Sequence, residues 1–244
     1  MQAMDMTYRQ DILAGRTALV AGATQGIGAA IANQLAAMGA RVVALGLGPG
    51  DGTLDASVRT RQADVTRQHD VDAALADFDR LDILFNCAGI IKRGQEHDPD
   101  VFQQVLDVNL TGTMRVCAAA RPALKAARGC IVNTASMLTF FGGGLVPGYA
   151  ASKGGVGQLT KSLAIAYAPD GIRVNAVAPG WIATPLTQAL QDDPARAGPI
   201  LARTPLARWG TPEDVARAAV FLCTPAAAFM TGVVLPVDGG YMVA

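Results

Sequence analysis

The sequence predicts a single α/β domain over residues 1–244: a doubly wound, parallel sheet of about seven strands with helices on both faces. Short apolar runs alternate with longer helical patterns along the whole chain, and aromatic residues make up only 5% of it. Strands that are apolar at nearly every position are typical of a parallel sheet buried on both faces. The repeated strand–helix order favours one doubly wound domain over two separate ones.

Six short, nearly all-apolar runs are predicted as strands. They are Thr17–Ala21, Arg41–Leu45, Leu81–Phe85, Cys130–Thr134, Arg173–Ala178 and Val233–Val237. A further strand is expected around Val58–Ala63. The residues before it, 46–53, read GLGPGDGT and contain too much glycine and proline for a helix. We therefore expect a loop between the second and third strands, where a doubly wound fold usually has a helix.

Four segments show helical patterns between these strands: Gly26–Met38, Pro99 to about Ala127, Tyr149–Tyr167 and Pro212–Leu222. Gly39 follows the first where a C-cap glycine is usual. Thr211 precedes the last with a capping hydroxyl, ahead of a proline and two acids. Residues 183–208 contain four prolines, so we expect an irregular insert that serves as a substrate loop or lid.

Composition argues against several classes of function. The formal net charge is zero and no basic run is present, so nucleic-acid binding is not indicated. Residues 1–13 lack the apolar stretch of a signal peptide, and no run approaches the roughly 20 apolar residues of a membrane span. The four cysteines, Cys87, Cys117, Cys130 and Cys223, lack metal-site or redox spacing. We therefore expect a cytoplasmic protein without a metal, whose cysteines are reduced core residues.

The first predicted strand leads into a glycine-rich turn, Gly22-Ala23-Thr24-Gln25-Gly26-Ile27-Gly28, directly before a helix. Glycine allows a positive φ and lets the backbone approach a phosphate closely. The helix N-terminus adds unpaired N–H groups and the positive end of a dipole. Since the turn follows the first strand of a βα series, it indicates a Rossmann-type dinucleotide site rather than a purely structural turn.

Tyr149 and Lys153 are four residues apart in a predicted helix and therefore lie on one face. A free tyrosine has a pKa near 10 and exchanges protons poorly at neutral pH. An ammonium group within about 4–6 Å favours the phenolate and lowers that pKa. The pair is a candidate for acid–base catalysis, although Tyr-x-x-x-Lys alone is common on protein surfaces.

Three further polar residues stand where ligand contacts are expected. Ser136 lies at the end of a predicted strand, and Asn86 begins the segment Asn86-Cys87-Ala88-Gly89 directly after another. Open α/β sheets bind ligands at the carboxyl ends of their strands. Asn109 interrupts an otherwise apolar helical segment, so its amide needs hydrogen-bond partners.

These motifs together resemble the short-chain dehydrogenase/reductase family over essentially the whole chain. The spacing G-x-x-x-G-x-G is similar to the family's opening motif, with Ala21 where a threonine is usual. The resemblance implies a catalytic tetrad. Tyr149 would exchange a proton with the substrate oxygen, and Ser136 would position that oxygen. Lys153 would bind the nicotinamide ribose and lower the pKa of Tyr149, and Asn109 would hold a water that links Lys153 to solvent.

The resemblance also implies which residues contact a nicotinamide dinucleotide. Asp64 and Val65 would lie at the adenine, and residues 179–184 along the nicotinamide. The complete expected set is Gly22, Thr24, Gln25, Gly26, Ile27, Gly28, Asp64, Val65, Asn86, Ala88, Gly89, Tyr149, Lys153, Pro179, Gly180, Ile182 and Thr184.

The end of the second strand bears on the choice between NAD and NADP. Members of the family that prefer NAD usually place an acid there, and here that position is Gly46. The positions where members that prefer NADP carry a cation are Leu47 and Gln25, both uncharged. A 2′-phosphate would lose its hydration without compensation. We therefore expect NAD, with NADP as the alternative if Arg41, Arg59 or Arg61 reaches the gap.

Two segments, 135–143 and 203–210, resemble 2-deoxy-3-keto-gluconate and gluconate 5-dehydrogenases within the family. They imply a sugar acid or another polyol as substrate. The alternatives are a 3-oxoacyl-thioester (acyl carrier protein) reductase and a non-catalytic NAD(P)-binding sensor, which typically loses the tyrosine or the lysine. Gly154, Gly155 and Gly157 would let a second helix approach Tyr149–Tyr167, and family members often associate through this helix. We therefore expect a homotetramer.

Overall fold

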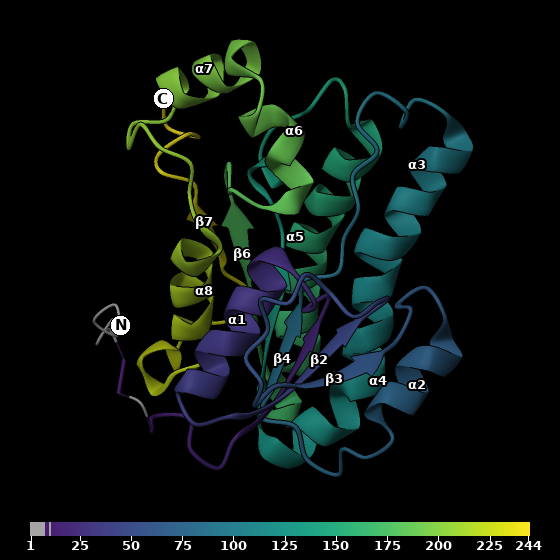
Figure 1. Cartoon of the computed structure of the whole chain (residues 1–244). Coiled ribbons are helices and arrows are strands. Elements are labelled where there is room, and N and C mark those ends of the chain that lie inside the picture. The colour runs from purple at the N-terminus through teal and green to yellow at the C-terminus, as the bar shows by residue number, and fades with distance from the viewer. Residues whose placement is uncertain (1–7, 10) are drawn as a thin grey trace.

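A computed structural model describes residues 8, 9 and 11–244 and confirms the predicted fold class (Figure 1). Seven parallel strands form one sheet in the order β3-β2-β1-β4-β5-β6-β7. Their bounds are β1 Thr17–Ala21, β2 Arg41–Gly46, β3 Arg59–Gln62, β4 Ile83–Asn86, β5 Cys130–Thr134, β6 Arg173–Pro179 and β7 Val234–Val237. The strand order reverses between β1 and β4, which opens a crevice at their carboxyl ends. Most of the segment tested for a signal peptide, residues 1–7 and 10, lies outside the described residues.

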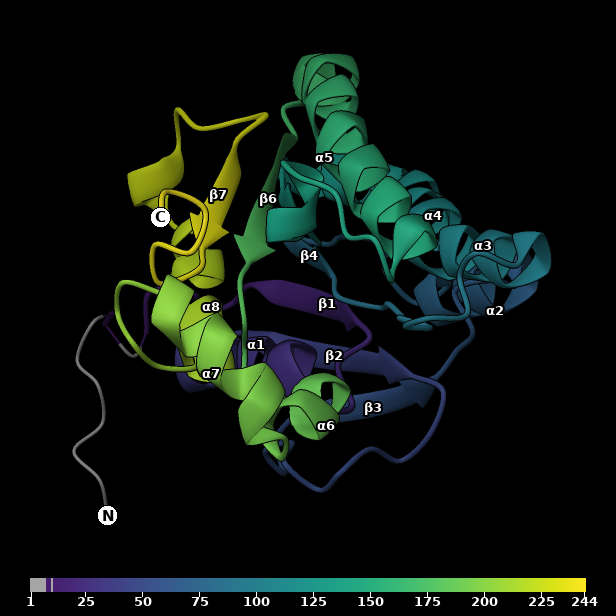
Figure 2. The same cartoon turned by 90° about the horizontal axis from the view of Figure 1, so that it is seen from above.

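Helices cover both faces of the sheet, as Figure 2 shows. The α-helices are α1 Gly26–Ala37, α2 Gln68–Leu75, α3 Pro99–Leu106, α4 Gly112–Ala127, α5 Pro147–Tyr167, α6 Gln188–Gln191, α7 Pro194–Arg203 and α8 Pro212–Phe221. On one face Ile31 of α1 and Val220 of α8 pack on buried strand residues such as Phe85. On the other face Leu124 of α4 and Leu163 of α5 pack on buried strand residues such as Leu84. In the part of the chain that is described, no helix is long and apolar enough to cross a membrane.

The loop expected between β2 and β3 is confirmed, but two helix predictions need correction. Helix α2 was missed because it is short and buries only Val71, Ala74 and Leu75. The stretch from Pro99 to Ala127 is helical throughout, yet α3 and α4 are joined by a π-helical segment, Asp107–Thr111.

The prediction that residues 183–208 are irregular is wrong. They contain a 3₁₀ turn at Pro185–Thr187, followed by α6 and α7, which lie beyond the carboxyl ends of the strands (Figure 1). The prolines misled the prediction because Pro194 occupies the first turn of α7, where a missing N–H costs nothing. Asp193 caps the same helix by accepting a hydrogen bond from the backbone N–H of Ala195 at 3.0 Å.

The glycine turn packs closely on its neighbours in the crevice. Gly22 has φ +76°, and a Cβ there would lie 2.3 Å from the backbone nitrogen of Ala88, just beyond β4. A Cβ on Gly28 would lie 2.1 Å from the backbone oxygen of Gly22. Backbone therefore packs directly on backbone where β1, α1 and the loop after β4 meet, and neither glycine leaves room for a methyl group.

We expect Gly28→Ala to lower the free energy of unfolding by about 3 kcal/mol, because the methyl group can fit only if the turn moves away from α1. Urea unfolding would measure the change. Gly142→Ala is the matched control, since a Cβ at Gly142 meets nothing within 4 Å. A Gly28→Ala protein as stable as this control would contradict the packing described above.

Candidate active site

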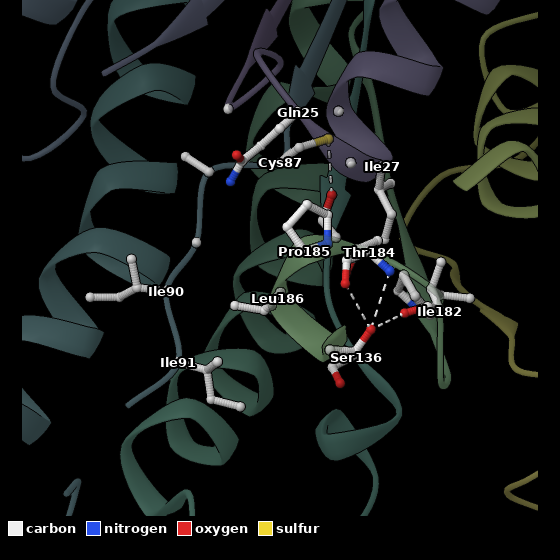
Figure 3. A pocket seen from close by; sticks show the side chains of 18 of the residues that line it. Gln25, Ile27, Cys87, Ile90, Ile91, Ser136, Ile182, Thr184, Pro185 and Leu186 are labelled. Carbon is white, nitrogen blue, oxygen red and sulfur yellow. Dashed lines mark hydrogen bonds between the residues drawn. The ribbon is translucent and has the colours of Figure 1, made fainter. Parts of the chain in front are cut away.

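A cavity of about 880 Å³ opens at the carboxyl ends of the strands (Figure 3). It is lined by the glycine turn, the ends of β2 to β6 and the segment that leads into α6. Ser136, Tyr149 and Lys153 line it, as do all the expected cofactor residues except Asn86. The structure thus brings together nearly the whole predicted set in one space. Among the described residues there is no group of three or more His, Cys, Asp or Glu side chains that could hold a metal ion.

The end of the cavity near β2 has little room for side chains. A Cβ on Gly46 would lie 2.4 Å from Cγ2 of Thr24, so any larger residue would have to displace that side chain. The Asp64 carboxylate accepts hydrogen bonds from the N–H and hydroxyl of Thr66 at 2.9 and 2.7 Å, and these bonds lower its pKa.

The three arginines considered as possible 2′-phosphate partners lie elsewhere. Arg41 is at the opposite end of β2, where its guanidinium donates to Oγ1 of Thr17 at 3.1 Å. Arg61 donates to the carbonyl oxygen of Ala74 and pairs with Asp77. Arg59 is exposed at the start of β3, in register with Val43 rather than with Gly46.

Ser136, Tyr149 and Lys153 converge from two elements. Ser136 caps the short 3₁₀ turn after β5, where its hydroxyl accepts a hydrogen bond from the N–H of Leu138 at 3.2 Å. Tyr149 and Lys153 lie in the first two turns of α5, with Nζ of Lys153 5.6 Å from the centre of the Tyr149 ring. Lys153 is 4% exposed, and its ammonium donates to the carbonyl oxygen of Thr134 at 2.6 Å. A hydrogen bond also joins the side chains of Ser136 and Tyr149.

Burial governs the protonation of this group. It lowers the pKa of Lys153 from 10.5 to about 8, because the ammonium has lost its hydration. Burial likewise raises the pKa of Tyr149, while the Ser136 hydrogen bond and the charge of Arg93 act in the opposite direction. In the chain by itself, burial penalises the phenolate more than its neighbours stabilise it. The lowering of this pKa by Lys153 together with a bound nicotinamide cation stays a prediction.

Asn109 lies in the π-helical segment, fully buried, and its amide is used by the protein itself. Its Oδ1 accepts from the N–H of Ile90 at 2.8 Å, and its Nδ2 donates to the carbonyl oxygen of Ile90 and to Oγ of Ser152, both at 3.0 Å. Gly89 separates it from Lys153: a Cβ on Gly89 would lie 3.4 Å from Oδ1 of Asn109 and 3.7 Å from Nζ of Lys153. Asn109 therefore anchors the loop after β4, and its role in holding a water stays a prediction.

Asn86 is the expected cofactor residue that the structure does not place at the cavity. Its side chain is buried, and its Nδ2 donates to Oδ1 of Asn133 in β5 at 2.9 Å and to Sγ of Cys117 at 3.2 Å. This side chain enters the core, because a strand's alternate side chains point to opposite faces. The place of Asn86 beside a cofactor stays a prediction.

Sequence analysis missed two cations on the cavity wall. Arg93 follows β4 in the loop Ile90-Ile91-Lys92-Arg93, and Arg196 comes from α7. Partial burial and, after it, the charge of Arg196 lower the pKa of Arg93, so the second guanidinium lies close enough to act on the first. In the described part of the chain neither forms an ion pair. Two adjacent cations after a strand were a usable signal for Arg93, whereas Arg196 lay in the segment predicted to be irregular.

Cys87, expected to be a core residue, also lines the cavity. Its Sγ accepts a hydrogen bond from Oγ1 of Thr134 at 3.2 Å. Burial raises the pKa of this thiol to about 11, so it stays protonated and unreactive at neutral pH. All four cysteines are free thiols.

The pKa of Lys153 predicts how stability depends on pH. Between pH 8 and 10.5 the folded chain has lost a proton that the unfolded chain keeps, so this lysine makes the protein more stable as pH rises through that range. Below pH 8 the buried charge costs about 3 kcal/mol. Lys153→Met removes this cost but also loses the hydrogen bond to Thr134. We therefore expect it to raise the free energy of unfolding by about 2 kcal/mol at pH 7.

Urea unfolding at a series of pH values would test this, and the advantage of Lys153→Met over the wild type should shrink between pH 8 and 10. Lys161→Met, an exposed site on the same helix, serves as the control and should show no such trend. A Lys153→Met protein less stable than the wild type at pH 7 would show that the buried ammonium is not strained.

Known proteins are similar to this chain over nearly its whole length. A family model described as "Enoyl-(Acyl carrier protein) reductase" matches residues 22–242. The 2-dehydro-3-deoxy-D-gluconate 5-dehydrogenase of Pseudoalteromonas atlantica is 42% identical, over 94% of this chain and 97% of that protein. The galactitol 2-dehydrogenase (L-tagatose-forming) of Cereibacter sphaeroides is 40% identical, over 98% of this chain and 100% of that protein.

Solved structures agree with these relatives. A putative NAD(P) dependent gluconate 5-dehydrogenase from Beutenbergia cavernae with bound NADP has a TM-score of 0.91 at 41% identity, covering 97% of this chain and 100% of that one. A gluconate 5-dehydrogenase from Burkholderia cenocepacia in complex with NADP and tartrate has a TM-score of 0.89 at 33% identity, covering 96% and 98%.

Proposed function

Because the chain belongs to the short-chain dehydrogenase/reductase family, we propose that it interconverts an alcohol and a ketone on a sugar acid. It is an NAD(P)-dependent oxidoreductase that transfers a hydride between the cofactor and a small alcohol or carbonyl substrate. The proposal concerns the identity of that substrate and the preferred cofactor.

The residues present fit a dinucleotide. Gly22, Gly26 and Gly28 of the glycine turn line the cavity, and α1 begins after Gln25, whose side chain does not cap the helix. The amides of the first turn of α1 are therefore available to a pyrophosphate. When bound, the nicotinamide supplies the hydride acceptor or donor. Lys153, near the carboxyl end of β5, is available to the nicotinamide ribose.

The side chains of the chain itself handle the proton. In the oxidation direction Ser136 donates a hydrogen bond to the substrate oxygen. Tyr149 removes the proton from that oxygen as the hydride leaves the carbon that bears it. The phenol must be deprotonated to act as a base, and Lys153, close to its ring, stabilises that form when it carries its proton. In the reduction direction Tyr149 returns the proton.

The arginine pair is the observation that carries the substrate assignment. Arg93 and Arg196 line the same cavity as Tyr149 and lie near each other, so their charges repel until an anion lies between them. Guanidinium groups bind carboxylates with paired hydrogen bonds. A substrate with a carboxylate at one end and a hydroxyl-bearing carbon near Tyr149 satisfies both features. Relatives named for gluconate derivatives, and the tartrate in one solved structure, support this choice.

We further propose NAD as the preferred cofactor, since the basic residues of the cavity wall, Arg93, Lys153 and Arg196, are not at the Gly46 end. Residues 183–208 would form the lid, because α6 and α7 close over the strand ends and carry Arg196. The homotetramer and the cytoplasmic location are also proposed. Ile165 on the outer face of α5 is 79% exposed, which suits a helix that packs against another subunit. The free thiols suit a reducing compartment.

A screen of sugar acids, polyols and 3-oxoacyl thioesters, each with NAD and NADP, tests the function through absorbance of the reduced cofactor. We expect turnover of sugar acids with NAD, and we expect Tyr149→Phe to reduce kcat about a thousandfold while the reduced cofactor still binds. Preferential turnover of acyl thioesters would favour an acyl carrier protein reductase instead. Cofactor binding without turnover of any class would favour a sensor.

Replacing Arg93 by alanine tests the carboxylate contact. We expect kcat/KM for a sugar acid to fall about tenfold to a hundredfold, since a charge-assisted hydrogen bond is lost, and kcat/KM for a neutral polyol to change little. Lys92→Ala is the matched control, because Lys92 is adjacent but does not line the cavity. Equal losses on acid and polyol would mean that Arg93 acts on the fold of the loop and not on the substrate.

A further inference from the structure

Glu96 is a buried acid that the mechanism above does not use. It lies in the loop between β4 and α3 and is 1% exposed. One carboxylate oxygen, Oε1, accepts from the N–H of Lys92 at 2.7 Å, and the other, Oε2, accepts from the N–H of Tyr149 at 2.7 Å. A Cβ on Gly148 would lie 3.3 Å from Oε2, so the carboxylate packs against the first turn of α5.

This carboxylate supplies the cap that α5 lacks. Val146 precedes the helix without a side-chain cap, Pro147 has no N–H, and Tyr149 carries one of the amides that have no partner within the helix. An acid at a helix N-terminus satisfies such an amide and is stabilised by the helix dipole. Two short charge-assisted bonds explain how a carboxylate is tolerated in a site closed to water.

The same carboxylate closes the loop that carries Arg93. Its bond to the N–H of Lys92 makes residues 92–96 a tight turn, and its bond to Tyr149 ties that turn to the start of α5. Arg93, whose side chain lines the cavity, lies inside the turn. The positions of the guanidinium and of the phenol along the cavity wall are therefore linked through one side chain.

We propose that Glu96 is a positioning residue that fixes the substrate-binding Arg93 relative to the catalytic Tyr149. The inference rests on the proposed function, which assigns Arg93 to the substrate carboxylate and Tyr149 to the proton. The distance between these two groups then sets how far the reacting carbon lies from the acid end of the substrate. Glu96 itself touches neither substrate nor cofactor.

The charge of Glu96 gives a readout that a purely structural residue would lack. The groups around the Tyr149 phenol are Ser136 from the turn after β5, Arg93 and Glu96 from the loop after β4, and Lys153 from α5, with Arg196 of α7 beyond Arg93. His97, next to Glu96, contacts the carbonyl oxygen of Gly144 through Nε2 at 2.9 Å. Of these, Glu96 raises the pKa of Tyr149, so its neutralisation should shift the pH dependence of oxidation to lower pH.

Two variants of Glu96 separate the effect of its side-chain length from the effect of its charge. Glu96→Gln keeps the length of the side chain but loses the charge and one acceptor: we expect kcat to fall about tenfold and the half-maximal pH of oxidation to move down. Glu96→Asp keeps the charge but cannot reach both amides, so kcat should fall with the pH profile in place. Asp100→Asn, an exposed acid at the start of α3, is the control and should change neither quantity. Unchanged kcat and pH profile in Glu96→Gln would overturn the proposal.

Two measurements decide the matter without a substrate. Phenolate absorbance of the wild type minus that of Tyr149→Phe reports the titration of Tyr149, and it should begin at lower pH in the Glu96→Gln background. Hydrogen exchange by NMR in the wild type should show the amide of Tyr149 protected relative to that of Gly148. An unprotected Tyr149 amide would overturn the proposal even if neither Glu96 variant folds. If no sugar acid is turned over, these readouts still judge Glu96 separately from the substrate assignment.

Discussion

The contact between the glycine turn and the loop after β4 is the constraint on which the site depends. Gly22 and Ala88 touch through their backbones because β1 and β4 are neighbours in the sheet while their connections run to opposite faces. This close approach places the start of α1 and the segment 87–93 on either side of one cavity. The glycine turn and the segment that carries Arg93 thus both extend from a single junction.

Around this junction, buried polar side chains replace the regular hydrogen bonding that loops lack. Asn109 holds both backbone groups of Ile90, Glu96 holds the N–H of Lys92, and Lys153 binds the carbonyl oxygen of Thr134. Each of these side chains would be costly to bury alone, and each is stabilised by the backbone that it fixes. The cavity wall is therefore ordered by polar contacts. Figure 3 shows Leu186 on the side of the cavity that faces Ile90 and Ile91.

Sequence alone predicted the central strands well because each is apolar at nearly every position. The edge strand β3 was located only approximately, since Arg59–Gln62 is largely polar and exposed. The need of Asn109 for partners was predictable, but its partner Ile90 was not, because that pairing depends on how a loop folds over a helix. The same reason hid that the side chains of Arg93 and Arg196 enter one cavity, since tertiary packing sets which way a side chain of a loop or of α7 points.

The π-helical segment between α3 and α4 has a consequence for changes in chain length. A π turn accommodates one residue more than an α turn, and here it displays Asn109 towards the loop while Arg115 and Asp107 form an ion pair at 2.9 Å from α4 to the segment. Because the wider turn takes up this residue within itself, a one-residue deletion that restored regular helix would leave the faces of α3 and α4 aligned. Its cost would fall on Asn109, whose amide would no longer be displayed towards both backbone groups of Ile90.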